Sequence, residues 1–505
     1  MGEYLHGAYG QQQAVGSRVS AESQSAVVLV GTAPVQTLEK NADNTYNVNK
    51  PILVNDIAEA RKYFGYSDDW TKYTLCEAMH VFLELAAVGP LVLINVLDPS
   101  KTGHKGTAGS KSLTPANGRV TITNAEDIIL DSIVVKSGSG QSEVTKVKGT
   151  DYTASYNYKK KTIVIAELTA GALGSSALAI TYDVVAPANV TSDDVIGASD
   201  GAGLNTGLYA IKNVYQECGV IPAYLMAPGW SEIPAVHAAM YMNSQKINTH
   251  WDAWMFTDIP ILHNNTAITL DTAATWKNTN GYNKPNETVS FPMFEGTDDK
   301  YYHASVIRAA NFLQLLAEND GIPYHTASNT EAGIIRNLWL GASAVGRVYD
   351  DALINEKLCK NGICSAAFVG GRWAIWGAHA ADYDQDNADN INVSETTMMM
   401  LYYISNDFQH RRTRDVDKPL SANDIQSIVA EEQSRLDALI KIGALTYAMA
   451  TLEADAIAKS DMYNGDYRFS FDVTTTPIAK SLTVIVNWVD DGFITYFETE
   501  ADTMA

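Results

Sequence analysis

The sequence predicts an α/β fold class, in which an α/β core is interrupted by a small all-β insertion and followed by an α+β C-terminal domain. Three observations predict it. Apolar runs of strand length alternate with amphipathic helices over residues 26–97 and again over 191–367. Short β-branched runs separated by turn residues fill residues 98–190. Long helical patterns and several strands share residues 368–505.

Composition and charge exclude several classes of protein and partner. The chain has 505 residues, of which 46% are apolar and 19% charged, so it is globular and long enough for about three domains. Its 36 Lys and Arg stand against 58 Asp and Glu, a net charge of −22. We therefore expect no nucleic-acid binding. We also expect no membrane insertion, because no apolar run reaches the length of a bilayer span.

Residues 1–25 predict an extended arm, because they are polar, glycine-punctuated and too poor in apolar residues to form a core. The arm is either a frayed terminus or a segment that pairs with another chain. Its start lacks the basic and apolar parts of a signal peptide. The cysteines are too few for a disulfide framework and are expected to be reduced thiols of a protein made in a cytoplasm: Cys76, Cys218, Cys359 and Cys364.

The first half of the core is expected to run strand, strand, helix, helix, strand. Asn55-Asp56 offers the first helix an N-cap, and Gly65 ends that helix. Gly89-Pro90 ends the second helix. The expected elements are strands at 25–34, 50–56 and 91–97 and helices at 57–65 and 72–89.

The insertion at 98–190 reads as an all-β module rich in Gly, Ser, Thr and Lys. It holds ten Lys and Arg against eight Asp and Glu, so it is slightly basic within an acidic chain. Its expected strands lie within residues 118–124, 131–140, 142–149, 161–168 and 176–185.

The second half of the core resumes the alternation of helices and strands. Ser231 is expected to cap one helix, and Gly321 to end another. The expected helices are 203–218, 231–246, 266–276 and 301–320, and the expected strands are 220–229, 251–260 and 288–296.

The C-terminal region predicts two helices and three strands. A helix is expected at 395–415, and Ser421 with Asp424 forms a capping box for a second one. The strands are expected at 468–474, 481–489 and 492–500. Asp490-Asp491-Gly492 predicts that the last two form a hairpin.

Searches for catalytic, cofactor and metal motifs assign no residue, so no cofactor is expected. Asp382, Asp384 and Asp386 have the spacing of a calcium loop but lack its glycine and bidentate Glu, which favours a solvated acidic loop over opportunistic cation binding. GAGLNTG at 201–207 lacks the GK[ST] of a phosphate loop. Ser343 lies outside a G-x-S-x-G pattern. Structural roles are favoured for the remaining candidates: Cys359, Cys364, His237, His303 and His325.

Two C-terminal features point toward contacts with other chains. The first is a basic cluster, which either pairs with its own Asp407, Asp415 and Asp417 or contacts an acidic partner: Arg411, Arg412, Arg414 and Lys418. The second is the predicted strand 481–489, which is apolar on both faces. It is either buried on its own domain or added to the sheet of a neighbouring subunit.

The order of several segments resembles the tail sheath proteins of contractile phage tails and phage-tail-like contractile bacteriocins. YLHGAYG at 4–10 is similar to the opening of that family. The stretch from SAVVLVGTAP to PLVLINVLD is similar to its first strands and helices. GGRWAIWGAHA at 370–380 resembles the segment that opens its C-terminal domain, and the run from FQHRRTRD onward resembles its C-terminal end. The resemblance covers most of residues 1–100 and 200–505, and leaves the insertion outside the shared core.

This resemblance implies a structural subunit that self-assembles into stacked rings around an inner tube, contracts without nucleotide hydrolysis and drives the tube through a cell envelope. It implies a non-catalytic core of subtilisin-like shape. The implied partners are other copies of the chain, the inner tail tube protein, and baseplate and tail terminator proteins. The implied location is a virion or phage-tail-like particle assembled in the bacterial host cytoplasm. The alternatives are an α/β hydrolase-like enzyme and a sheath whose insertion binds glycans.

The resemblance also implies site residues and domains. Arms are expected to join neighbouring subunits by adding strands, with these candidates: Tyr4, Leu5, His6, Tyr9, Val15, Val484, Val486, Trp488, Phe493 and Tyr496. The basic cluster becomes the candidate tube-facing surface, and the insertion is expected on the outer surface. The expected domains are an arm at 1–25, core parts at 26–97 and 191–367, the insertion at 98–190, and a C-terminal sheath domain at 368–505.

Overall fold

The computed structural model describes residues 25–138, 143–342, 346–384, 394–453 and 464–489. The chain forms two compact units, residues 1–419 and 420–505, and each is described by itself. The domain boundaries drawn from the sequence follow changes of residue pattern rather than compactness, and they stay a prediction.

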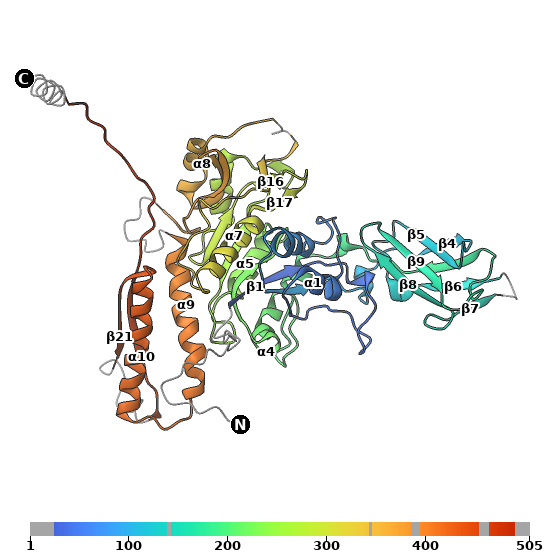
Figure 1. The fold of residues 1–505 in the computed structure, drawn as a ribbon, viewed down its shortest axis with the longest axis horizontal. Coiled ribbons are helices and arrows are strands. Elements are labelled where there is room, and N and C mark those ends of the chain that lie inside the picture. Colours follow the sequence, from blue (N-terminus) through green and yellow to red (C-terminus); the bar gives the residue numbers. More distant parts are fainter. Residues whose placement is uncertain (1–24, 139–142, 343–345, 385–393, 454–463, 490–505) are drawn as a thin grey trace, which may run out of the picture. The chain divides into compact units, whose positions relative to one another are not determined.

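An eight-stranded sheet forms the centre of the first unit (Figure 1). Its strand order is β2-β3-β1-β11-β12-β15-β19-β20, with parallel inner strands and antiparallel strands at both edges. β1 is buried from Ala26 to Gly31, as expected of a parallel strand covered on both faces. The strands are β1 Ser25–Gly31, β2 Ile52–Val54, β3 Leu91–Asn95, β11 Ile221–Met226, β12 Trp254–Asp258, β15 Glu287–Ser290, β19 Ile363–Val369 and β20 Arg372–Trp376.

Some helices of the first unit begin and end close to where the sequence predicts, others start later, and α3 and α8 were not predicted. Asp56 caps α1 by accepting the backbone N–H of Glu59 at 2.9 Å, and Gly65 follows with a φ of 72°. The helix expected at 72–89 is α2 continued by a π-helical segment, Met79–Leu85. The helices are α1 Ile57–Phe64, α2 Leu75–Ala78, α3 Ser192–Ile196, α4 Val214–Cys218, α5 Pro234–Met242, α6 Leu270–Thr279, α7 Ala304–Glu318, α8 Asp351–Lys357 and α9 Glu395–Arg412.

The predicted role of Ser231 as a helix cap is wrong. The helix begins at Pro234, with Ile233 as its N-cap, because proline is well suited to the first helical position. Ser231 Oγ instead accepts the backbone N–H of Asp258, at 3.3 Å.

The strand expected over 288–296 is two strands in different sheets. β15 belongs to the large sheet, whereas β16, Met293–Gly296, lies at the centre of a three-stranded sheet. Pro292 separates them, since it has no N–H with which to continue a ladder. The flanking strands of the small sheet are β17 Tyr301–Tyr302 and β18 Ile335–Trp339.

Two other predicted helices start later than expected. The one at 203–218 begins as a 3-10 turn, Gly207–Asn213, that continues into α4. The one at 266–276 begins at Leu270, where Thr269 and Thr272 form a capping box. The residues before that box form the short hairpin β13 Leu262–His263 and β14 Thr266–Ala267.

The insertion folds into two antiparallel sheets, β4-β10-β6-β7 and β5-β9-β8. Val120, Ile122, Ile163 and Ile180 belong to its own hydrophobic core. All five expected strands are present, and β4 and β8 are additional. The bounds are β4 Gly109–Leu113, β5 Arg119–Thr123, β6 Val134–Ser137, β7 Val144–Lys146, β8 Tyr152–Asn157, β9 Thr162–Glu167 and β10 Leu178–Tyr182.

Polar and apolar contacts join the insertion to the core. Asp127 accepts hydrogen bonds from the Tyr73 hydroxyl at 2.7 Å and the Lys72 ammonium at 3.0 Å. Gln36 Nε2 donates to the Glu126 carbonyl at 2.9 Å. Ile129, which lies in the insertion, is part of the main hydrophobic core rather than of the insertion's own.

The second unit contains α10, Ala422–Lys441, and an antiparallel pair, β21 Leu445–Leu452 with β22 Phe469–Thr475. The expected capping box is confirmed, because Ser421 and Asp424 exchange side-chain and backbone hydrogen bonds. On β21, Ala448 and Ala450 are buried, whereas Tyr447 and Met449 are exposed. Among the described residues of both units, no helix has the length and apolarity needed to cross a membrane.

Candidate assembly surfaces

The most exposed apolar surface lies after β22. Residues 476–489 contain no helix or strand, so the strand expected at 481–489 has no partner among the described residues. Its apolar side chains keep most of their surface in solvent: Leu482 92%, Val484 81%, Ile485 79%, Val486 85%, Trp488 79% and Val489 64%. The described residues of its own domain therefore do not bury this segment, and the first alternative from the sequence finds no support among them. The predicted partner strand 492–500, with Phe493 and Tyr496, lies outside the described residues.

Exposing these apolar side chains to water is unfavourable, and burying them against another chain lowers the free energy. Burying a Val, Leu or Ile side chain contributes about 1.5–3 kcal/mol, so several of them together can stabilise a contact with another chain. Contiguous exposed apolar surface on a folded protein commonly marks an interaction site. The alternation of Val484, Val486 and Trp488 also gives the segment one apolar face if it becomes a strand.

β21 and β22 offer a complementary feature. Within the described part of the second unit each of these two strands pairs only with the other. Along β21, the Gln433 side chain of α10 donates to the Ala448 carbonyl at 3.2 Å and accepts the Ala450 N–H at 2.8 Å. A two-stranded sheet is of marginal stability and gains from further strands. The unit therefore presents an extended apolar segment and a small sheet.

Most side chains of the basic cluster form ion pairs with nearby aspartates, Asp407 and Asp415. Arg411 Nε lies 2.9 Å from Asp407 Oδ2, in a pair whose side chains are each 11% exposed. Asp415 pairs with Arg412 at 3.3 Å and with Lys418 at 3.2 Å. Burial raises the pKa of Asp415, but the hydrogen bonds and charges of Lys418 and Arg412 outweigh it and lower that pKa below its ordinary value. Arg414 is exposed, and its Nε donates to the Arg411 carbonyl at 3.2 Å. The structure thus favours the first alternative for all of the cluster except Arg414.

The N-terminal candidates lie outside the described residues. These are Tyr4, Leu5, His6, Tyr9 and Val15. Their part in assembly stays a prediction.

The described residues contain no hydrogen bond between a histidine ring and a serine hydroxyl, which a hydrolase triad requires. His237 bonds Glu287 at 2.7 Å, and His303 bonds Glu77 at 2.6 Å. His325 bonds the side chain of Asn319. Nothing in this geometry favours the hydrolase alternative.

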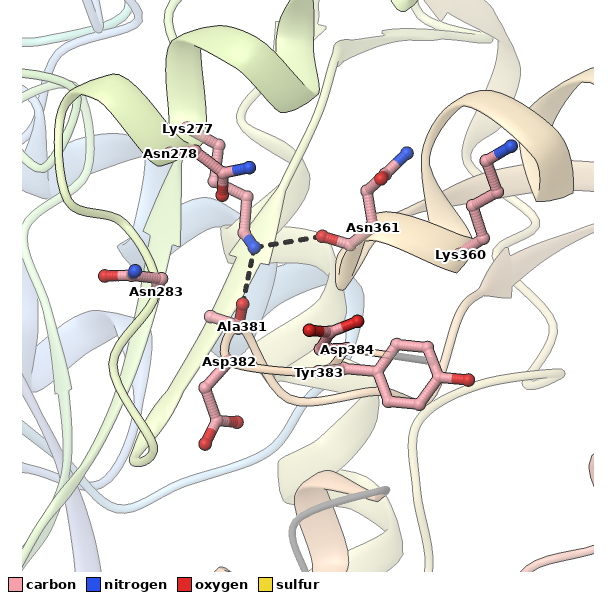
Figure 2. Close-up of a pocket in the computed structure, with 9 residues that line it drawn as sticks. All are labelled: Lys277, Asn278, Asn283, Lys360, Asn361, Ala381, Asp382, Tyr383 and Asp384. Atoms are coloured by element: carbon pink, nitrogen blue, oxygen red, sulfur yellow. Dashed lines mark hydrogen bonds between the residues drawn. The ribbon is translucent and has the colours of Figure 1, made fainter. Parts of the chain in front are cut away.

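A polar pocket of about 410 Å³ lies beside the acidic loop (Figure 2). Asp382 and Asp384 line it, while Asp386 lies outside the described residues. No three His, Cys, Asp or Glu of the described chain are grouped to hold a metal. The buried Lys277 ammonium donates to the carbonyls of Asn361 and Ala381, and burial lowers its pKa to about 8. No sequence pattern points to this lysine, because its two carbonyl partners are distant in the chain.

The chain is similar to tail sheath proteins in sequence. No protein-family model matches it. The tail sheath protein of Burkholderia phage BcepMu is 30% identical to it over 233 residues, which are 45% of this chain and 43% of that protein. The match therefore spans less than half the length of this relative.

The chain is also similar to sheath proteins in fold. The contracted helical sheath of the anti-feeding prophage superposes with a TM-score of 0.52 at 11% identity, covering 97% of this chain and 100% of the other. The contracted PVC sheath complex of an extracellular contractile injection system gives 0.53 at 11%, covering 97% and 99%. The sheath tail protein of Desulfitobacterium hafniense gives 0.50 at 11%, covering 94% and 100%. The resemblance to contractile tail sheath proteins is confirmed, and the mixed α/β fold is theirs.

Proposed function

We propose that this chain is the structural subunit of a contractile tail sheath. It assembles with copies of itself into rings stacked around an inner tube and contracts to drive the tube through a cell envelope. The observation that best supports this is the fold likeness to sheath proteins of contracted particles, which extends over nearly the whole chain. The sequence relative is itself a tail sheath protein.

Contraction needs a source of free energy, and we infer that this source is the contacts between subunits. The glycine-rich stretch at 201–207 lacks the lysine and hydroxyl residue of a phosphate loop. We therefore infer that free energy is stored in subunit contacts during assembly and is released when these contacts rearrange, without nucleotide hydrolysis.

Strand addition between subunits supplies tethers that survive such rearrangement. In this proposal the segment 482–489 of one subunit adds as a strand to a sheet of a neighbouring subunit, which covers Val484, Val486 and Trp488. The N-terminal arm, with Tyr4, Leu5, His6, Tyr9 and Val15, and the C-terminal Phe493 and Tyr496 take part in the same way.

The remaining partners follow from the sheath role. The basic cluster faces the inner tube, with Arg414 as its available cation. Baseplate and tail terminator proteins bind the two ends of the polymer, and the particle is assembled in a bacterial host. We further propose that the core has a subtilisin-like shape without catalysis, and that the insertion faces outward.

Electron microscopy of the purified full-length chain tests the proposal. We expect rings or tubes of regular width, and tubes of sheath around a filament when a purified tail tube is added. A chain that stays monomeric at all protein and salt concentrations, with and without the tube, contradicts the proposal. Deletion of residues 1–20 provides the comparison: it should leave a folded monomer that does not polymerise.

A further inference from the structure

A cluster of titratable side chains lies inside the first unit, apart from the proposed assembly surfaces. It gathers residues from four elements. Glu77 belongs to α2, Glu232 follows β11, Asp258 ends β12, and His303 directly precedes α7. Glu77 is 1% exposed and Asp258 3% exposed, so carboxylates stand in the interior of the fold.

Glu77 fastens the start of α7 to α2. One of its carboxylate oxygens accepts the backbone N–H of His303 at 2.6 Å, and the other lies 2.6 Å from Nδ1 of the same imidazole. A second tie joins the neighbouring segments, because Gln314 Nε2 donates to the Ala86 carbonyl at 3.0 Å. Hydrogen bonds thus join α7 to the stretch 77–86 at two points, at the start of the helix and at Gln314.

The charges of two further carboxylates, Glu232 and Asp258, act on the same imidazole. Glu232 Oε1 lies 3.7 Å from His303 Nε2. Asp258 accepts the backbone N–H of Ser305 at 2.9 Å and also the hydroxyl of that residue. Two tyrosines are further titratable groups near this site: Tyr282, whose hydroxyl donates to the Ser231 carbonyl, and Tyr302, whose hydroxyl donates to Asp298. The negative charges of three carboxylates therefore act on one imidazole, and the cluster is anionic when all of them are ionised.

Burial and mutual repulsion make this cluster bind protons tightly. Burial alone disfavours a charged imidazole, but the charge and hydrogen bond of Glu77, with Glu232 and Asp258, outweigh it and raise the pKa of His303 to about 10. Burial, opposed by His303 but reinforced by Asp258 and Glu77, raises the pKa of Glu232 to about 7. The Glu232 side chain remains 21% exposed, so solvent screens part of this effect.

We propose that this cluster is a pH-sensitive latch that holds α7 against α2, closed when the cluster carries its protons and weakened as they leave. An unfolded Glu232 would ionise near its ordinary pKa of 4.5, so the folded state loses stability relative to the unfolded one as pH rises from there through about 7. The stability from His303 is fully present below 6.5 and is lost as pH rises through about 10. Both groups act in the same direction.

Hydrogen–deuterium exchange of the full-length chain, read by mass spectrometry and corrected for intrinsic exchange rates, tests the latch. Between pH 6 and 9 we expect protection of 304–318 and 75–86 to fall by at least about tenfold, since each pKa unit corresponds to a tenfold change in equilibrium. Peptides of the insertion strand β9 serve as the internal reference and should change little. Equal loss in all regions, or no change in α7, overturns the proposal.

Two matched variants separate the latch from a general charge effect. Glu232→Gln should reduce the pH dependence of α7 between pH 6 and 8 and leave the part that comes from His303. Glu84→Gln is the control, because Glu84 also pairs with a histidine, His80 at 2.8 Å, but at the surface. The proposal fails if both variants show the same pH dependence of α7 protection as the unmodified chain. It also fails if both variants lose this pH dependence equally. If Glu232→Gln does not fold, the pH series of the unmodified chain decides. The latch is independent of the sheath role, because a chain that forms no tubes can still show it.

Discussion

The first residue of α9 shows how one side chain can position a whole helix. Glu395 is 1% exposed and accepts hydrogen bonds from Arg308 at 2.6 Å, from Thr288 at 2.7 Å and from Thr326. Arg308 is equally buried. Because both charges are away from water, each depends on the other far more than a surface pair does.

We predict that Arg308→Met destabilises the first unit by about 3–5 kcal/mol, because it leaves the Glu395 carboxylate buried with two hydroxyl groups only. Urea denaturation followed by tryptophan fluorescence measures the loss. Arg336→Met is the matched control, since Arg336 pairs with Glu295 at the surface with 47% of its side chain exposed. Similar midpoints for the two variants would show that the buried pair has no special role.

Residue roles were the least predictable part of the molecule. Asp56 and Ser421 were predicted as caps from local sequence alone, because a cap contacts residues two or three positions away. Ser231 was predicted as a cap too, and wrongly, since its partner Asp258 is on a distant strand. The same holds for Glu395, whose partners come from α7 and β15.

At the scale of elements, continuous apolar runs predicted strands correctly where both faces of the strand are buried. The strands at 25–34 and 91–97 were found because parallel strands in the centre of a sheet are continuous apolar runs. β4, with the sequence GSKSL, was missed because its stability comes from pairing with β10 rather than from β-branched residues. The segment 481–489 has strand composition without a strand, because no partner is present within the described residues.

That segment gives a prediction about assembly. Val486→Asp should abolish polymerisation without lowering the stability of the monomer, because the side chain is 85% exposed in the isolated chain and is covered only in the polymer. Thr483→Asp introduces the same charge on the same segment, outside the apolar face, and should assemble more nearly like the unmodified chain. Sedimentation and electron microscopy report assembly, and thermal denaturation reports the fold. Normal tubes from Val486→Asp would argue against strand addition by this segment.

The basic cluster allows a sharper test than reversal of all its charges. Arg411→Glu places a carboxylate beside Asp407 in a mostly buried pair, so it should destabilise the fold itself. Arg414→Glu changes an exposed side chain and should leave the fold intact. If the cluster faces the tube, Arg414→Glu lowers co-sedimentation of the sheath with purified tube at low salt. Unchanged co-sedimentation would mean that the cluster serves only its own unit.

At the scale of the whole molecule, the insertion is less separable than its sequence suggests. The residue pattern predicted an independent β module, and its two sheets do have their own core. Ile129 and Val185, however, belong to the main core, and Asp127 is bonded to Tyr73 of the first half. These contacts join residues far apart in the chain, so no local sequence pattern predicts them. Deleting residues 101–188 would therefore damage the core, and is a poor test of what the insertion does.

This coupling leads to a prediction that tryptophan fluorescence can test directly. None of the nine tryptophans lies in residues 98–190, so fluorescence reports only on the rest of the chain. Ile163→Ala removes a fully buried side chain from the core of the insertion, at a cost of about 2–5 kcal/mol. If the insertion and the core unfold together, the midpoint of the tryptophan transition in urea shifts downward by a corresponding amount. Val144→Ala, at an exposed insertion position, is the control and should leave the midpoint in place. The contrary result is a tryptophan midpoint that does not change in Ile163→Ala, together with a loss of β-structure at lower urea in circular dichroism. That result would mean that the insertion unfolds independently, because its contacts with the core are too weak to couple the two.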